Sequence, residues 1–302
     1  MDLRRLRFLV QHLSFLVLIY GGRAGIRLGP SLPCFGCPYV YGCGGQCYLM
    51  GLQGYIGLGI SFENFMGFEG LRAIFWLFIF LLLFALLGKS WCGWVCPLGL
   101  VSDYLTKFRR FLGVKGINFS QSTLKRLRPI KYILLSYLLL GPVLINLGWL
   151  HPDFYLPFCQ ICPGKALLPI FEGQGQYLAL DMTNPVTITQ SAFLVALTAV
   201  TVVGLFFRER FFCLFCPMLA IFNLLKPLAA LRLIKTPKVC RGCASCRRVC
   251  PMEVGEVYEE RLNAYVAAPE CLGCGDCLVS CPSENSLSLS FLGRKVVSSS
   301  RR

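Results

Sequence analysis

Eight cysteines near the C-terminal end of the chain form two copies of one spacing, C-x2-C-x2-C-x3-C-P, which begin at Cys240 and Cys271. Three thiolates on one tight loop can bind three irons of a [4Fe–4S] cube. The fourth cysteine, carried away by its proline, then binds the other cube. The repeat therefore predicts two [4Fe–4S] clusters. The expected ligand sets are Cys240, Cys243, Cys246 and Cys281 for one cluster, and Cys271, Cys274, Cys277 and Cys250 for the other.

Zinc is the alternative metal for this repeat, because paired C-x2-C motifs also bind zinc. A tetrahedral zinc site has no use for a third C-x2-C step followed by x3-C-P, so the spacing favours iron. Basic residues surround the first copy, whereas Glu270 and Asp276 flank the second. We therefore expect the first cluster to have the higher reduction potential, unless these are solvated surface charges that have little effect.

The rest of the chain is unusually apolar. Of its 302 residues 55% are hydrophobic, and the mean hydropathy is +0.61. Segments 71–87, 133–150 and 192–207 approach the roughly 20 apolar residues that cross a bilayer. The shorter segment 8–20 is counted as a fourth span. The fold expected is an all-α polytopic membrane bundle of about four transmembrane helices, followed by a small α+β ferredoxin domain of the bacterial 2[4Fe–4S] type.

The expected domains are a transmembrane helical domain at 1–235 and a ferredoxin domain at 236–302. The glycine-rich segment 50–70 is expected to be re-entrant or interfacial. Segment 219–235 alternates apolar and basic residues, which is typical of an amphipathic helix on the membrane surface. Segment 296–302 is expected to be a frayed polar tail.

The formal net charge is +15, and the basic residues gather beside the apolar spans. Arg208 and Arg210, which follow the last span, belong to this group. Membrane topology explains this distribution more simply than nucleic-acid binding does. We expect membrane lipid as a partner and no nucleic acid. The positive-inside rule predicts a multi-pass protein of the cell inner membrane, with its N-terminus and its ferredoxin domain in the cytoplasm.

Two cysteine pairs directly follow predicted spans on the cytoplasmic side, Cys92 with Cys96 and Cys213 with Cys216. A proline follows each pair and is expected to occupy the first position of a helix. Together the pairs offer the four thiolates of a third [4Fe–4S] cluster. The alternative is free cysteine buried at apolar helix ends, where it packs as a small hydrophobic residue.

Six further cysteines lie on the predicted outer side. Two C-x2-C-P motifs resemble the inner pairs, so the favoured set for a fourth cluster is Cys34, Cys37, Cys159 and Cys162. A second partition uses Cys34, Cys37, Cys43 and Cys47. Disulfides are the remaining alternative, because an oxidising compartment favours them.

The order of these motifs resembles the NapH-type family of ferredoxin-like membrane quinol dehydrogenases. The matching stretches run from Cys92 to Leu98, from Cys213 to Pro217, and through both copies of the repeat. The second inner motif is C-x2-C-P where the family has C-x3-C-P, and the six outer cysteines are additional. The resemblance implies electron delivery from quinol, or from a cytoplasmic donor, to an extracytoplasmic redox partner.

The function predicted is therefore iron–sulfur electron transfer at the membrane, within a respiratory complex. Expected partners are other subunits of a redox complex and an extracytoplasmic cytochrome or reductase. Quinone is a further expected cofactor, with its site unknown. Two rival functions share the motifs. One is a maturation or repair factor that reduces metal centres of another enzyme. The other is a non-catalytic redox sensor, which needs only one labile site.

Overall fold

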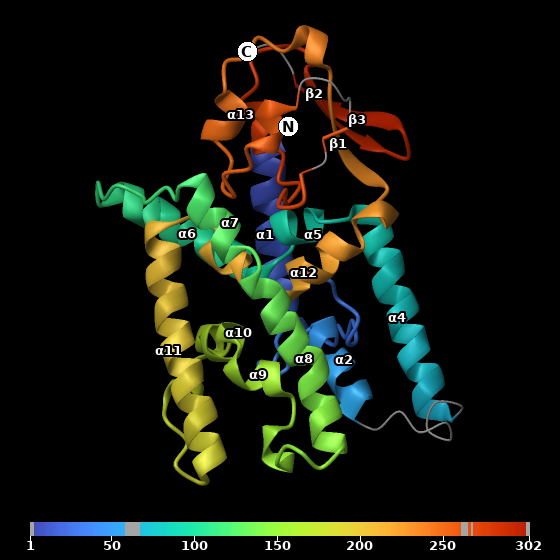
Figure 1. Cartoon of the computed structure of the whole chain (residues 1–302), viewed down its shortest axis with the longest axis vertical. Helices are drawn as coiled ribbons and strands as arrows, with labels where there is room; N and C mark the ends of the chain where they lie inside the picture. Colours follow the sequence, from blue (N-terminus) through green and yellow to red (C-terminus); the bar gives the residue numbers. More distant parts are fainter. Residues whose placement is uncertain (1–2, 58–66, 261–264, 267, 300–302) are drawn as a thin grey trace.

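The computed structural model describes residues 3–57, 67–260, 265–266 and 268–299. Long helices stand side by side, and a small unit with three strands lies at one end of them (Figure 1). The N-terminus lies at this same end, beside the small unit. The fold is therefore mostly helical, with one compact mixed unit at the C-terminal end of the chain.

Three helical segments of the described chain are long and apolar enough to cross a membrane. They are α4 (Phe68–Leu87), the stretch formed by α7 (Gln121–Leu127) and α8 (Ile130–Asn146), and α11 (Pro185–Phe207). The expected fourth span lies in α1 (Leu3–Tyr20), which carries three arginines in its first turns. Four spans were expected, and the structure supports three of them.

Local sequence explains where the long helices begin and end. Asn184 and Thr187 form a reciprocal capping box at the start of α11, and Pro185 occupies its first position. Gly88 ends α4 with a left-handed φ of 53°, which a residue without Cβ adopts at little cost. These signals hold the apolar stretches to defined lengths.

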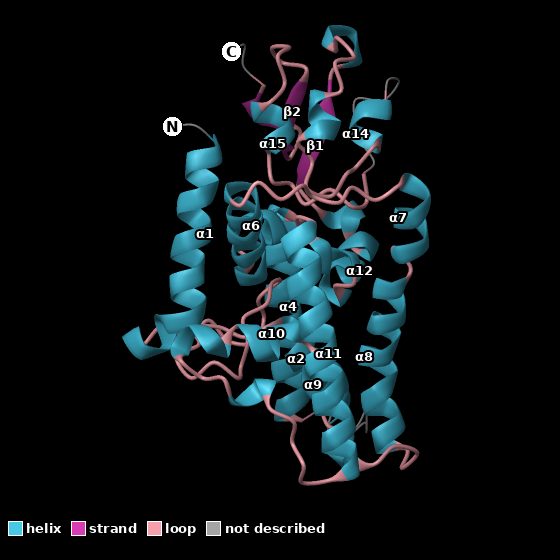
Figure 2. Ribbon diagram, turned by 90° about the vertical axis from the view of Figure 1, so that its left-hand side faces the viewer, coloured by secondary structure: helices cyan, strands magenta, loops and turns pink. Residues whose placement is uncertain are grey.

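Short helices fold back between the long ones. They are α2 (Tyr48–Gly57), α9 (Pro157–Ile161) and α10 (Pro163–Leu167). They lie beside α8 and α11 near the middle of the bundle (Figures 1 and 2). The first part of the expected re-entrant segment 50–70 is thus the helix α2, while 58–66 lie outside the described residues. The segments between the spans enter the bundle instead of forming loops at its end.

Three further helices close the bundle below the small unit, namely α5 (Ser90–Trp94), α6 (Pro97–Phe111) and α12 (Pro217–Leu224). Aromatic rings pack shorter helices against α4: Tyr48 of α2 stacks on Phe80 with centroids 4.1 Å apart, and Phe222 of α12 lies 4.8 Å from Phe84. The prediction of a surface helix at 219–235 is wrong. Leu219 and its neighbours in α12 are buried, and a strand follows, because their apolar side chains fill the end of the core.

The C-terminal unit is built on an antiparallel sheet in the order β1-β2-β3. Leu233 pairs with Leu289 across its first two strands. The strands are β1 (Leu231–Lys235), β2 (Leu287–Phe291) and β3 (Arg294–Ser298). Around them lie α13 (Ser245–Arg248), α14 (Glu256–Glu259) and α15 (Asp276–Val279). The sheet begins before the expected boundary at 236, and 296–298 belong to β3 where a frayed tail was expected.

Buried ion pairs join the C-terminal unit to the helices. Lys131 of α8 is 0% exposed and pairs with Glu270, whose side chain is 4% exposed. Arg7 of α1 pairs with Asp276 at the start of α15, at 2.5 Å. Glu270 directly precedes Cys271, and Asp276 directly precedes Cys277. The residues before these two cysteines therefore also anchor the unit to the bundle.

Replacing Glu270 by alanine would leave Lys131 buried without its partner, which typically costs about 3–5 kcal/mol. We expect Glu270→Ala to lower the free energy of unfolding by about that amount, measured by denaturation of the detergent-solubilised protein. Glu69→Ala is the matched control, because Glu69 and Arg72 form a pair whose side chains are 52% and 53% exposed. Such exposed pairs contribute roughly 0–1 kcal/mol. Equal losses in the two variants would contradict this role of Glu270.

Candidate metal centres

The two copies of the cysteine repeat adopt the same backbone. Gly242 and Gly273, at equivalent positions, have φ values of 69° and 63°. Ala244 and Gly275, which are also at equivalent positions, have φ values of 57° and 82°. Each precedes a short helix that carries the third cysteine of its copy. Residues with left-handed φ between the first and second cysteines, and between the second and third, make the chain turn tightly. Successive thiols therefore turn toward one another.

The thiols of the repeat gather in two groups. Burial raises the pKa of Cys246, and the thiols of Cys240 and Cys281 lie close enough to add to this shift. Cys243 lies at the surface, where the N–H of Ser245 lowers its pKa. The second group lines one cavity, which Cys246 also reaches; its members are Cys250, Cys271, Cys274 and Cys277. The fourth cysteine of the first copy thus lies beside three cysteines of the second copy, while the ligand sets remain a prediction.

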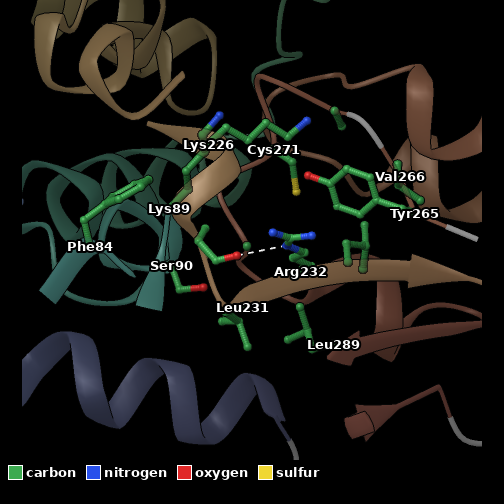
Figure 3. Close-up of a pocket in the computed structure, with 14 residues that line it drawn as sticks. Phe84, Lys89, Ser90, Lys226, Leu231, Arg232, Tyr265, Val266, Cys271 and Leu289 are labelled. Carbon is green, nitrogen blue, oxygen red and sulfur yellow. Dashed lines mark hydrogen bonds between the residues drawn. The ribbon is translucent and has the colours of Figure 1, made fainter. Parts of the chain in front are cut away.

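A basic cavity lies at the seam between the C-terminal unit and the bundle (Figure 3). Lys89, Lys226 and Arg232 line it together with Cys271. Burial and the neighbouring Lys226 lower the pKa of Lys89 to about 8. Burial raises the pKa of Cys271, and both lysines oppose this shift. The cations therefore favour negative charge on this sulfur.

A third group of thiols lines a largely apolar cavity between the small helices at the end of the bundle. Its members come from α5 and from the turns before α6 and α12, and they are Cys92, Cys96, Cys213 and Cys216. Leu98, Leu219 and Phe212 supply much of the lining. The structure thus brings together the two inner pairs that the sequence singled out. A fifth cysteine, Cys34, also reaches this cavity.

The proline after a cysteine places backbone N–H groups around the sulfur. Pro97 and Pro217 occupy the first helical positions of α6 and α12, as expected, with Cys96 and Cys216 as the N-caps. Burial raises the pKa of Cys96, and the N–H groups of Leu98 and Gly99 offset part of that rise. The N–H of Leu219 acts likewise on Cys216. These cysteines make no short side-chain capping hydrogen bond, so the donors act on sulfur electrostatically.

Arg210 brings a positive charge to the cavity lined by the two inner cysteine pairs, which we call the inner cavity. It is 2% exposed and donates from Nη2 to Asp103, at 2.9 Å, and from Nη1 to the carbonyl of Cys92, at 3.2 Å. Its Nε has no hydrogen-bond partner among the described residues. Burial lowers the pKa of Arg210, but Asp103 and the nearby thiols reverse this and leave it raised. A fixed positive charge therefore faces the inner thiols.

The outer cysteines divide differently from either expected partition. Cys37, Cys159 and Cys162 line a cavity together with Cys47. Cys34 belongs instead to the inner cavity, and the sulfur of Cys43 contacts the carbonyl of Gly45, at 2.5 Å. The favoured set of Cys34, Cys37, Cys159 and Cys162 thus shares three of its four members with the observed group.

The grouping of the cysteines bears on zinc and on disulfides, the two alternatives to iron–sulfur clusters. All eighteen cysteines are free thiols, including the six that were expected to form either a cluster site or disulfides. Within the described ranges, no three Cys, His, Asp or Glu side chains converge closely enough to hold a single ion. In a [4Fe–4S] site each thiolate binds a different iron, so its four sulfurs need not meet at one point.

Sequence reasoning missed two side chains of these sites. Arg210 was interpreted as a topology charge, yet it is buried three residues before Cys213. Gln53 of α2 is 1% exposed and donates to the sulfur of Cys159, at 3.2 Å. A lone glutamine in the apolar run 48–57 is the signal that could have identified it, because a buried amide requires partners.

Two family models match the chain. One, described as a 4Fe-4S binding domain, matches residues 69–115 and 190–234, which contain both inner pairs. The other, a 4Fe-4S dicluster domain, matches 232–282 and so covers the repeat. The six outer cysteines lie outside both matches. No solved structure matches the chain.

Relatives match over about 70% of the chain. The protein YccM of Escherichia coli is 26% identical over 224 residues, which are 72% of this chain and 56% of the relative. The ferredoxin-type protein NapH of Haemophilus influenzae is 27% identical over 67% of this chain and 63% of its own length. The regulatory protein NosR of Pseudomonas aeruginosa is 27% identical over 72% of this chain. The match covers 27% of NosR, and less than two thirds of each of these relatives.

Close packing around Arg210 can be tested at Gly99. A Cβ at this position would lie 2.0 Å from Nη1 of Arg210, which Asp103 and the Cys92 carbonyl hold in place. We expect Gly99→Ala to destabilise the protein by about 1–3 kcal/mol, measured by denaturation in detergent. Gly54→Ala is the control, since a Cβ at Gly54 meets no atom of the described residues within 4 Å, and alanine favours a helix by roughly 0.5–1 kcal/mol. A neutral Gly99→Ala variant would show that Arg210 is free to move.

Proposed function

Because the chain belongs to the NapH-type family of ferredoxin-like electron transport proteins, we propose that it passes electrons between the quinone pool or a cytoplasmic donor and an extracytoplasmic redox partner. It is an iron–sulfur electron transport protein with helices suited to the inner membrane. The proposal concerns the donor, the acceptor and the route between them.

The route requires three clusters with the ligands that the sequence indicated. Two belong to the repeat and the third to the inner cavity. The ligand sets proposed are Cys240, Cys243, Cys246 and Cys281; Cys250, Cys271, Cys274 and Cys277; and Cys92, Cys96, Cys213 and Cys216. When bound, [4Fe–4S] clusters supply one-electron carriers whose potentials depend on surrounding charge and hydrogen bonds.

The residues present fit such groups. Each cavity presents cysteine sulfur, the ligand type that these clusters require. Backbone N–H groups and a buried cation face the sulfurs of the inner cavity, and both stabilise negative charge there. Apolar side chains such as Leu205 and Met218 complete the lining and exclude water. A dry, preorganised site of this kind needs little reorganisation when its charge changes.

The observation that carries the proposal is a contact between two cavities. One is lined by the second group of repeat cysteines, around Cys271, and the other is the inner cavity. Leu272 lines both. Gly93, between the two cysteines of the first inner motif, packs so tightly on the tail loop that an added Cβ would lie 2.8 Å from the Leu272 carbonyl oxygen. It would also lie 3.1 Å from Cα of Cys274. A single layer of protein therefore separates the two groups of thiols.

The orientation proposed places the C-terminal unit and the N-terminus in the cytoplasm of a multi-pass inner membrane protein. The C-terminal unit, α6 and α7 lie at one end of the molecule (Figure 1). The segment from α6 to α8 carries eight basic residues, from Lys107 to Lys131, which the positive-inside rule assigns to the cytoplasmic side. The domain arrangement proposed is a membrane bundle before Leu231 and a ferredoxin unit from there onward.

The inner ligand set can be tested by iron content. The double variant Cys92→Ala/Cys213→Ala removes two of its four sulfurs. We expect anaerobically purified variant protein to lose about four irons per chain relative to the parent and to keep the EPR signals of the repeat. Cys43→Ala is the control, because Cys43 lines neither cavity. An unchanged iron content would exclude the inner set.

The electron route can be tested in lipid nanodiscs. The protein is reduced with dithionite, excess reductant is removed, and a water-soluble quinone analogue is added. We expect rapid reoxidation of the signals of the repeat in the parent protein, and slow reoxidation in the Cys92→Ala/Cys213→Ala variant because the bundle no longer connects them to the membrane. Equal rates in both proteins would exclude this route. In a second experiment, with donor kept in excess, electron flow that stops after one turnover would favour the maturation or repair function.

A further inference from the structure

We propose that Cys37, Cys47, Cys159 and Cys162 ligate a fourth [4Fe–4S] cluster inside the membrane bundle. This inference rests on the proposed function and extends its route by one carrier. Its starting point is that four thiols from two separate segments line one cavity, to which Lys165 and Tyr39 also contribute. Three of these cysteines are at most 8% exposed, and Cys159 is partly buried.

The local fold brings Cys47 beside Cys37. Residues 31–47 form a loop whose ends meet, with Leu32 and Cys47 in a parallel bridge. The N–H of Cys47 donates to the carbonyl of Gly36, at 2.8 Å, which draws it against the first motif. Gly36 allows this approach, because a Cβ there would lie 2.4 Å from the carbonyl oxygen of Gly45. The loop thus supplies one sulfur from each of its arms.

The other two sulfurs come from the connection between α9 and α10. Leu156 precedes α9 in the left-handed region, with φ of 51°, and Pro157 and Pro163 begin the two helices. Cys162 is the N-cap of α10. Cys162 and Pro163 therefore repeat the cysteine-proline arrangement of the inner cavity, at a position that lies deeper between the long helices.

A buried side-chain donor faces one of the four sulfurs. The amide of Gln53 donates to Cys159 at 3.2 Å. Its Oε1 accepts from the N–H of Phe158 at 2.9 Å, which fixes the amide in place. A fixed, buried amide on the sulfur is suited to a thiolate ligand, because a thiol packed as a hydrophobic residue has no need of it.

Lys165 provides positive charge at this cavity. Its ammonium group lies 4.9 Å from the ring centre of Tyr39 and donates to Gln160, at 2.5 Å. Lys165 lines the cavity together with Cys37 and Cys159. A cluster with four thiolate ligands carries net negative charge, and the ammonium group would offset part of it.

Cys34 and Cys43 are the two outer cysteines that this assignment excludes. Cys34 lines the inner cavity together with Cys92 and Cys96. The thiol of Cys43 donates a hydrogen bond to the carbonyl of Gly45. Neither side chain lines the cavity that contains Cys37 and Cys47.

The fourth site is adjacent to the third. Phe35 lines both cavities, and the thiol of Cys96 lies near enough to raise the pKa of Cys162. The elements that carry the fourth site pack against α8 and α11, near the middle of these helices (Figures 1 and 2). The hydrocarbon core of a bilayer is about 30 Å thick. A carrier at this depth would shorten the remaining distance to the outer face.

Iron content separates the fourth site from the rest. We expect about sixteen irons per chain in the parent and about twelve in Cys47→Ala, with the EPR signals of the other clusters retained. Cys34→Ala and Cys43→Ala should keep about sixteen, since neither sulfur is a ligand in this assignment. Iron loss in Cys34→Ala with no loss in Cys47→Ala would overturn the assignment.

Two lower iron contents of the parent protein would lead to different conclusions. About twelve irons, with four of the outer cysteines recovered as disulfides after denaturation and alkylation, would overturn the fourth site and leave the proposed function intact. About eight irons would contradict the inner set as well, and with it the proposed function. The two failures are therefore distinguishable in one measurement.

Gln53 offers a second test, independent of ligand removal. In Gln53→Met the sulfur of Cys159 loses its amide donor, so the reduced cluster becomes less stable. We expect the iron content to stay unchanged and the reduction potential of one cluster to fall, measured by EPR redox titration. Gln160→Met is the control, because Gln160 contacts Lys165 but no sulfur. A Gln53→Met protein with all potentials unchanged would contradict the fourth site.

Discussion

The arrangement of backbone N–H groups around the sulfur of a cysteine that precedes a proline is the interaction on which these sites depend. The proline begins a helix or turn and has no N–H itself, so the donors of the next residues remain free. They act on sulfur at Cys37, Cys96, Cys162, Cys216 and Cys250. Without them a thiolate in an apolar bundle would have little to stabilise its charge. One dipeptide thus recurs in the ferredoxin unit and in both membrane cavities.

The sequence was most informative where ligand spacing is local. The repeat predicted which cysteines converge near Cys250 and Cys271, since three of the four lie within a few residues of one another. The helix-starting roles of Pro97 and Pro217 were also predictable. Whether Cys34 or Cys47 joins Cys37, Cys159 and Cys162 was not predictable. It depends on how the loop 31–47 closes on itself, which no periodicity encodes.

Charge was the least predictable property. Glu270 and Asp276 were expected to lower the potential of the second cluster, yet each faces a buried or half-buried cation, Lys131 or Arg7. Arg210 was assigned to topology and proves to face the inner thiols. In each case the partner comes from a distant part of the chain. The formal charge around a motif therefore says little about the field at its sulfurs until the fold is known.

The buried pairs at Lys131 and Arg7 also bear on motion. They fasten the two sides of the second cysteine loop to α8 and to α1, and water is excluded from the Lys131 contact. Because buried pairs are screened only weakly by salt, the ferredoxin unit does not swing on a tether as a mobile shuttle would. The contact between the unit and the bundle is therefore part of the fold itself, and it needs no docking equilibrium to form.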